Sequence, residues 1–338
     1  MGEKQGLQSD NKSFSMAQQI MNNKLLITVE HLSRHYGPIQ AVSSVDFELK
    51  RGEVLGFLGP NGAGKSTTMQ MITGNLAPSA GKISICGIDL LDDPKAAKAE
   101  IGYLPEQPPV YRDFTVDEYL DFCARINRLA KDKIAAAVDN AKQRCGLTEV
   151  GKRLIGNLSK GYQQRVGIAQ AIIHSPAIVV LDEPTVGLDP IQIREIRSLI
   201  RELANEHGVI LSTHILPEVQ MTCDRVQIIN KGKLVFSDNI KNLDQRMRAT
   251  TLLLELRNPP AENALQNLPG VSQCEALGDN RFRLSHTHEQ NPAEQIAEQV
   301  VQQGWGLLAL SPERKSLEQV FVEITSSEQI SHEEGEAA

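Results

Sequence analysis

Residues 59–66 read Gly-Pro-Asn-Gly-Ala-Gly-Lys-Ser and directly follow the apolar segment Val54–Leu58. They fit the phosphate-binding pattern GxxxxGK[ST], in which the glycines let the loop curl so that backbone N–H groups point at phosphates. The pattern requires a buried strand before it and a helix after it, and residues 54–58 and 65–73 supply both. The sequence therefore predicts nucleotide binding in an α/β fold. The candidate binding residues here are Gly59, Pro60, Asn61, Gly62, Ala63, Gly64, Lys65, Ser66 and Thr67.

A second apolar segment, residues 178–181, ends in the adjacent acids Asp182 and Glu183. Open α/β sheets place their ligand chemistry at the carboxyl ends of strands, so these acids are expected beside the phosphate loop, as we call residues 59–66. There Lys65 would reach the β and γ phosphates, and Ser66 with Asp182 would hold Mg²⁺. Glu183 would polarise the attacking water. The alternative is a strand that ends in polar residues as it reaches solvent, stopped by Pro184.

Apolar periodicity divides the rest of the chain into an α/β domain at 23–240 and a smaller domain at 250–325. Strands and helices alternate in the first domain, which predicts a mainly parallel sheet covered on both faces. A helical insert at about 108–165 interrupts this alternation, with two helices between 116 and 145. The second domain has the order βαββαβ, which predicts a ferredoxin-like α+β fold.

The two ends of the chain have a different texture. Residues 1–22 are polar without apolar periodicity and are expected to be a disordered leader. An amphipathic helix is expected at 316–324, and an acidic tail follows at 326–338.

Composition excludes several classes of protein. With 35 Lys and Arg against 42 Asp and Glu, the net charge is −7, so nucleic acid is not an expected partner. The five cysteines have no close pairing, which suits a reducing compartment. No run approaches the roughly 20 apolar residues of a spanning helix, and the start lacks a signal-peptide pattern. A cytoplasmic protein is expected.

Residues 158–165, Leu-Ser-Lys-Gly-Tyr-Gln-Gln-Arg, resemble the signature motif of ATP-binding cassette (ABC) ATPases. We call them the signature segment. The resemblance implies a P-loop ABC ATPase core with a helical subdomain that hydrolyses ATP as a homodimer. It also implies that Ser159 and Gly161 contact the γ phosphate of ATP held by the partner chain. The usual motif is LSGGQ, and this chain has Lys160 and Tyr162 at two of its positions.

Further positions follow in the order that the family has. Tyr36 stands where an aromatic stacks on adenine, Asp189 lies in the D-loop (187–189), and His214 stands at the switch histidine. Glu106 occupies the place where the Q-loop usually has Gln, and Gln107 follows it, so either side chain is a candidate. Each position also has an alternative interpretation without a role in nucleotide binding. Tyr36 could be a loop aromatic, and Asp189 could be a helix N-cap. His214 could be a buried histidine, and Glu106 could be a solvated acid.

The resemblance spans about residues 24–240 and is closest to ABC-2 type exporter cassettes. It implies an ATPase peripheral on the inner face of the membrane, where dimer closure drives a separate polytopic subunit. The alternatives are a soluble ABC ATPase acting on ribosomes or DNA, and a nucleotide-binding module without turnover. The small domain is expected either to support the dimer, to regulate it, or to be a passive appendage.

Overall fold

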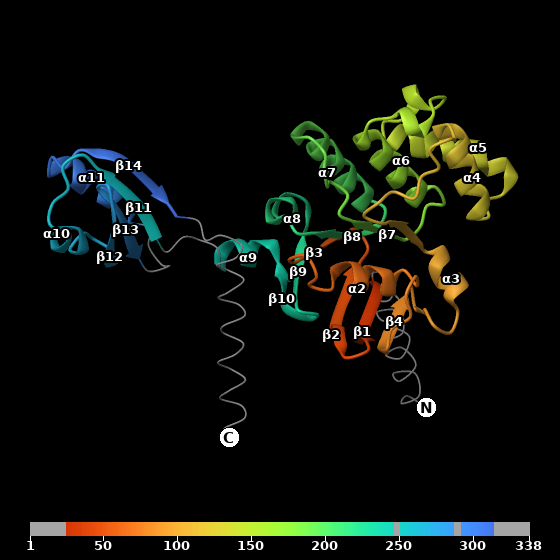
Figure 1. Cartoon of the computed structure of the whole chain (residues 1–338), viewed down its shortest axis with the longest axis horizontal. Coiled ribbons are helices and arrows are strands. Elements are labelled where there is room, and N and C mark those ends of the chain that lie inside the picture. Colours follow the sequence, from red (N-terminus) through yellow and green to blue (C-terminus); the bar gives the residue numbers. More distant parts are fainter. Residues whose placement is uncertain (1–24, 247–250, 287–291, 314–338) are drawn as a thin grey trace, which may run out of the picture. The chain divides into compact units, whose positions relative to one another are not determined.

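The computed structural model describes residues 25–246, 251–286 and 292–313. The chain divides into two units, one ending at Ile240 and the other beginning at Lys241 (Figure 1). Each unit has an apolar core of its own. The expected leader (1–22), the expected helix at 316–324 and the acidic tail (326–338) lie outside the described residues.

A six-stranded sheet forms the centre of the first unit. Its order is β10-β9-β3-β8-β7-β6, and every neighbouring pair is parallel except β10 with β9. Strands β3, β7 and β8 are buried along their whole length, as expected for parallel strands covered on both faces. The predicted mainly parallel sheet is therefore confirmed. Its strands are β3 (Val54–Leu58), β6 (Ile101–Leu104), β7 (Ile178–Asp182), β8 (Gly208–Thr213), β9 (Arg225–Asn230) and β10 (Lys233–Asn239).

The remaining strands of this unit form a separate antiparallel sheet, which the sequence analysis did not distinguish from the parallel one. Its order is β2-β1-β4-β5. Helix α2 (Lys65–Ile72) contacts both sheets. Between the sheets, the rings of Phe47 and Phe57 pack edge to face, with their centroids 4.8 Å apart. The two sheets therefore share one core. The strands are β1 (Leu25–Tyr36), β2 (Ile39–Lys50), β4 (Ala80–Ile85) and β5 (Ile88–Asp89).

Helices α6 (Lys160–Ile172), α7 (Pro190–Ala204) and α8 (Leu216–Thr222) cover the face of the parallel sheet opposite α2 (Figure 1). Helix α8 lies so close to β3 that a Cβ at Gly56 would be 2.8 Å from Cys223 Sγ and 2.9 Å from a methyl of Val219. The next residue, Phe57, points to the opposite face of the sheet, because successive residues of a strand alternate in direction. There it belongs to the core that the two sheets share. The absence of a side chain at Gly56 therefore lets the C-terminal part of α8 pack directly against the middle of β3.

The helical insert comprises α4 (Val116–Ile126) and α5 (Lys131–Arg144) and continues into α6, beyond the expected limit of 165. Thr115 and Glu118 form a capping box at the start of α4, which fixes where that helix begins. Short helix α3 (Pro94–Ala99) precedes β6.

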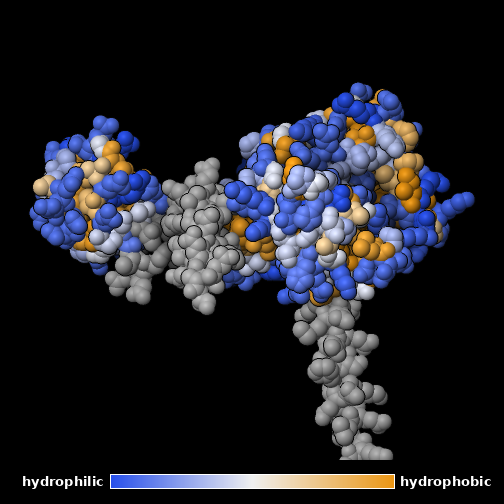
Figure 2. Space-filling model, turned by 60° about the horizontal axis from the view of Figure 1, so that its bottom comes forward, coloured by the Kyte–Doolittle hydropathy of each residue, from blue (hydrophilic) through white to orange (hydrophobic). Residues whose placement is uncertain are grey.

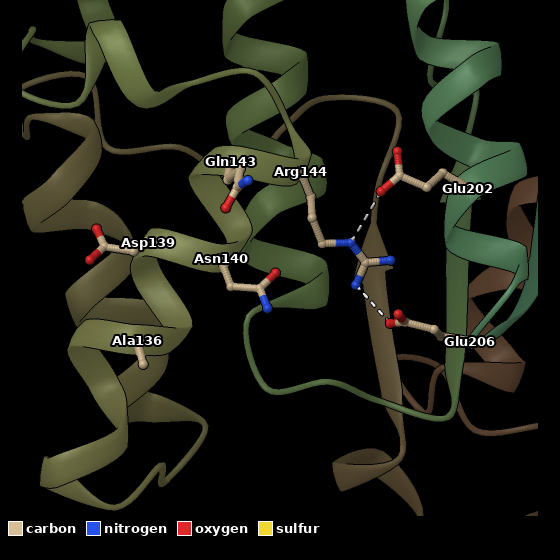
Figure 3. A pocket seen from close by; sticks show the side chains of 7 residues that line it. All are labelled: Ala136, Asp139, Asn140, Gln143, Arg144, Glu202 and Glu206. Carbon is tan, nitrogen blue, oxygen red and sulfur yellow. Dashed lines mark hydrogen bonds and ion pairs between the residues drawn. The ribbon is translucent and has the colours of Figure 1, made fainter.

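Ion pairs fasten the insert to α7. The guanidinium of Arg144, at the end of α5, lies 3.0 Å from Glu206 and 3.8 Å from Glu202. Figure 3 shows these side chains facing one another at a polar groove. Glu202 belongs to α7, and Glu206 follows the end of that helix. Arg165 on α6 pairs with Glu195, which also belongs to α7. Although only 17% of the Arg144 side chain is exposed, 66% of the Glu206 side chain is, so solvent screens this pair as it does other surface pairs.

An antiparallel sheet, with helices α10 and α11 between its strands, forms the described part of the second unit. Its strand order is β12-β13-β11-β14, and the β11–β13, β11–β14 and β12–β13 pairs are all antiparallel, which is the ferredoxin-like arrangement that the sequence predicts. Leu252, Leu254 and Leu256 alternate into its core. The elements are β11 (Thr251–Leu256), α10 (Glu262–Gln266), β12 (Val271–Gly278), β13 (Arg281–His286), α11 (Ala293–Gln302) and β14 (Leu307–Pro312), preceded by α9 (Ile240–Arg246).

The exposed large apolar side chains of the described residues are spread over both units. Figure 2 shows a mainly hydrophilic face with small apolar patches. Across the described residues, no helix combines the length and apolar character needed to cross a membrane.

Candidate nucleotide-hydrolysis site

The phosphate loop connects β3 to α2 through two glycines with left-handed backbone. Gly62 has φ 78° and Gly64 has φ 108°, values that residues with a Cβ rarely adopt. A Cβ at Gly64 would also lie 2.6 Å from the carbonyl oxygen of Ala41. Gly64 is the N-cap of α2 and offers no side-chain cap, so the first N–H groups of this helix are available to an anion. The half-buried Ser66 and Thr67 belong to this first turn.

Lys65 is buried between the phosphate loop and the end of β7. Only 6% of it is exposed, and its Nζ donates hydrogen bonds to the carbonyl oxygens of Gly59 (2.9 Å) and Pro60 (3.3 Å). The same Nζ lies 3.6 Å from Glu183 Oε1. The ammonium is thus positioned at the loop, and it links the loop to the acids at the end of β7.

Asp182 is the last residue of β7 and is suited to a cation. It is 2% exposed, yet its Oδ1 has no hydrogen-bond partner, so a lone pair is free for coordination. Among the described residues there is no group of three or more His, Cys, Asp and Glu side chains that could hold a metal. One carboxylate and a hydroxyl such as that of Ser66 fit Mg²⁺, which keeps waters and phosphate oxygens as its other ligands. When bound, this ion would neutralise charge on the phosphates.

Glu183 and His214 form a close pair beside Asp182. The His214 Nδ1 lies 3.0 Å from both carboxylate oxygens of Glu183. Glu183 has a left-handed backbone at φ 49°, held by its N–H donating to the Ser212 carbonyl oxygen at 2.9 Å. Such strained conformations cost on the order of 1–3 kcal/mol and occur at functional sites. With 42% of its side chain exposed, His214 is not the buried histidine of the alternative reading.

Glu106 and Gln107 lie on the segment that leaves β6. The register of β6 and β7 places Leu104 opposite Leu181, so this segment starts beside Asp182. Both Glu106 and Gln107 are exposed, and both remain candidates for the Q-loop role. Burial, and then the negative charge of Asp182, hold the pKa of Tyr103 above its ordinary value. The electrostatic influence of Asp182 therefore extends to β6.

Two predicted residues have local partners of their own. Tyr36 is 44% exposed, and the Arg34 guanidinium lies 4.7 Å from the centre of its ring. Asp189 is the N-cap of α7 and accepts hydrogen bonds from Ile191 N (2.9 Å) and Gln192 N (3.0 Å). The helix-capping reading of Asp189 is therefore realised, and it leaves the second carboxylate oxygen available.

The signature segment lies at the start of α6, on the insert. Ser159 is the N-cap of this helix, and Lys160 and Gly161 face the D-loop and α7 of the same chain. A Cβ at Gly161 would lie 2.6 Å from Gln192 Cδ, and one at Gly187 would collide with Lys160 Nζ. The structure thus brings Lys65, Asp182, Glu183 and His214 together. It places Ser159 at the start of α6 and Gly161 against α7 of the same chain.

Strand β8 has a role in this site that was not predicted from the sequence. Ser212 lies opposite Asp182 in the parallel register, and its carbonyl oxygen accepts the hydrogen bond of the Glu183 backbone N–H. The contact between Lys65 and Glu183 was not predicted either. The polar residues Ser212 and Thr213 after the apolar residues 209–211 were the signal that could have indicated this role. The pairing of β8 with β7, however, is not visible from the local sequence.

The fold and the site define a nucleotide-hydrolysing protein of the phosphate-loop class. The chain belongs to the ABC transporter ATP-binding family and hydrolyses ATP: the family model described as "ABC transporter" matches residues 42–186, and relatives match over nearly the whole chain.

Three comparisons show how far the similarity extends. The bacitracin transport ATP-binding protein BcrA of Bacillus licheniformis is 34% identical over 302 residues, covering 88% of this chain and 97% of that protein. The linearmycin resistance ATP-binding protein LnrL of Bacillus subtilis (strain 168) is 30% identical over 306 residues, covering 89% and 98%. The solved structure of cbiO1 from Clostridium perfringens, part of the ABC transporter complex cbiONQ, has a TM-score of 0.61 and 32% identity, covering 65% and 91%.

Proposed function

We propose that the chain is the ATP-hydrolysing subunit of an ABC-2 type exporter. In this proposal it is peripheral on the inner face of the membrane and drives a separate polytopic subunit. The observation that carries the proposal is similarity along almost the whole chain, second unit included, to two ATP-binding proteins named for bacitracin transport and linearmycin resistance. The similarity therefore extends well beyond the catalytic motifs that all ABC ATPases share.

The proposed mechanism gives each residue of the site one task. Lys65 neutralises the β and γ phosphates, while Ser66 and Asp182 hold Mg²⁺. Glu183 orients and polarises the attacking water, and His214, 3.0 Å from that carboxylate, fixes its position. The exposed face of the Tyr36 ring stacks on adenine.

A second copy of the chain completes this site in the proposed dimer. Ser159 and Gly161 of one copy contact the γ phosphate of ATP that the other copy holds. Asp189 lies at the same interface between the two copies. Either Glu106 or Gln107 fills the Q-loop role and would contact Mg²⁺. Closure of the dimer on ATP and its reopening after hydrolysis convert the nucleotide state into movement of the membrane subunit.

A composite site predicts that turnover depends on protein concentration. The phosphate release rate per chain is expected to rise with chain concentration and to level off once sedimentation shows dimers in ATP. A rate per chain that stays constant over concentrations at which the chain sediments as a monomer during turnover would refute the two-chain requirement.

The membrane subunit is proposed to dock near residues 103–125. Four aromatic rings cluster there, with centroids 5.5–6.0 Å apart. Tyr111 belongs to this cluster and is 51% exposed, so an apolar, aromatic surface is available to a partner. Interfaces commonly derive much of their affinity from such aromatic anchors.

Tyr111→Ala is expected to weaken binding of the membrane subunit about tenfold or more, as for a central aromatic anchor. The rate of ATP hydrolysis by the isolated chain should stay at the parent value, because Tyr111 is not a residue of the hydrolysis site. Titration of the detergent-solubilised membrane subunit against the immobilised chain measures the affinity. The matched control is Val301→Ala, which removes a 66% exposed apolar side chain from α11. Equal affinities of the two variants would remove Tyr111 from the docking surface.

A further inference from the structure

A carboxylate outside the predicted site is buried beside it. Glu218, in the first turn of α8, is 1% exposed. Its Oε1 accepts a hydrogen bond from Thr185 Oγ1 at 2.6 Å, and its Oε2 accepts one from Thr213 Oγ1 at 2.9 Å. The Arg197 guanidinium lies 3.9 Å from Oε1. A buried carboxylate is tolerated only with such partners, so its position is tightly defined.

The two threonines belong to the two loops that carry the hydrolytic pair. Thr185 follows Glu183 by two residues at the end of β7, and Thr213 directly precedes His214 at the end of β8. Glu218 therefore bonds, through separate oxygens, to both loops whose tips place His214 Nδ1 3.0 Å from Glu183. The backbone bond from Glu183 N to Ser212 O joins the same two loops at their base.

We propose that Glu218 is a positioning residue for ATP hydrolysis, bracing the Glu183 and His214 loops against each other. The inference rests on the proposed roles of Glu183 and His214. Glu218 contacts neither of their side chains in the bonds described, so it acts only through Thr185 and Thr213. A carboxylate accepts from both hydroxyls at once, whereas a Gln amide accepts from one hydroxyl and can only donate to the other through its NH2 group. An apolar residue makes neither bond.

The strained backbone of Glu183 explains why its loop needs the additional restraint from Glu218. Its φ of 49° is unfavourable for a residue with a Cβ, so the loop returns to a relaxed backbone unless other bonds hold it. Thr185 is close enough along the chain for its bond to Glu218 to restrain this backbone. Loosening the bond would move the Glu183 carboxylate relative to the γ phosphate without altering the phosphate loop.

The test compares kcat and KM for ATP in Glu218→Ala, Glu218→Gln and Thr185→Val. Because a misplacement of about 1 Å can cost about 100-fold in rate, Glu218→Ala is expected to lower kcat by about 10- to 100-fold. Its KM should stay within about threefold of the parent value, since phosphate binding is untouched. Glu218→Gln keeps one acceptor and should recover part of the lost kcat. Thr185→Val removes one hydroxyl at nearly constant shape and should lower kcat without changing KM.

The matched control is Glu53→Ala. Glu53 is also a buried carboxylate, 8% exposed and 2.8 Å from Arg225, but it precedes β3 at the end of the sheet opposite the site. It should lose stability and keep the parent kcat below its melting temperature. A folded Glu218→Ala with the parent kcat overturns the brace. If that variant does not fold, a parent kcat in both Thr185→Val and Glu218→Gln overturns it instead. Parent-level turnover by Glu183→Gln would remove Glu183 from the proposed base role, on which the inference about Glu218 rests. Loss of turnover in Glu183→Gln, with Glu218→Ala unaffected, would refute the positioning role of Glu218 alone.

Discussion

Glu183→Gln is expected to bind ATP as the parent does and to lose at least about 100-fold in turnover, the usual contribution of a general base. The amide keeps the shape of the side chain and one acceptor for His214. It carries no negative charge, however, so it can neither accept a proton from the attacking water nor polarise that water as a carboxylate does. Binding should survive because Lys65 and the phosphate loop are unchanged. Steady-state phosphate release and the affinity for a fluorescent ATP analogue measure the two effects separately.

The same variant should accumulate as a dimer in ATP, because closure no longer leads to hydrolysis. Sedimentation with ATP and with ADP distinguishes the closed dimer from separate chains. Glu53→Gln is the control, since Glu53 is buried to a similar degree but lies at the other end of β3. Parent-level hydrolysis by Glu183→Gln would remove this residue from the base role.

Lys65→Ala is expected to lower the affinity for ATP about 10- to 100-fold, because a charge-assisted hydrogen bond contributes about 1.5–3 kcal/mol. The Nζ of Lys65 already lies at the phosphate loop, 2.9 Å from the Gly59 carbonyl oxygen. Phosphate oxygens would therefore replace this carbonyl oxygen as hydrogen-bond acceptors of Lys65. Titration with the fluorescent analogue gives the affinity, and turnover at low ATP should fall at least as far.

The control for this change is Lys82→Ala, which removes an exposed lysine from β4, away from the loop. The melting temperature of each variant shows whether the loss of the buried Lys65 charge, 3.6 Å from Glu183, has disturbed the fold. A folded Lys65→Ala that binds ATP with the parent affinity would contradict the assignment of the phosphate loop.

Strand and helix positions could be predicted where burial imposes a strong local pattern. Residues 54–58 and 178–181 are continuous apolar runs because both faces of their strands are covered. Strand β6, Ile101–Leu104, was missed because it has four residues and a glycine and a tyrosine within them. The separate antiparallel sheet was also missed, since the choice between sheets depends on non-local pairing and not on alternation.

The residues of the site could be predicted better than their geometry. Lys65, Asp182 and Glu183 stand in spacings that phosphate chemistry imposes, so their identities are visible in the sequence. The 3.0 Å approach of His214 to Glu183 joins residues 31 positions apart, and only the β7–β8 register creates it. Glu218 was not anticipated for the same reason: its bond to Thr185 spans 33 positions.

This ATPase is proposed to drive a separate membrane protein, and isolation of the chain from its native host tests that proposal. The tagged chain is recovered from membranes solubilised in mild detergent, and mass spectrometry identifies what co-purifies in near-stoichiometric amount. We expect a polytopic membrane protein, recovered less well with Tyr111→Ala than with Val301→Ala. Recovery instead of ribosomal or DNA-repair proteins, with no polytopic partner, would refute the transporter role and favour a soluble ABC ATPase.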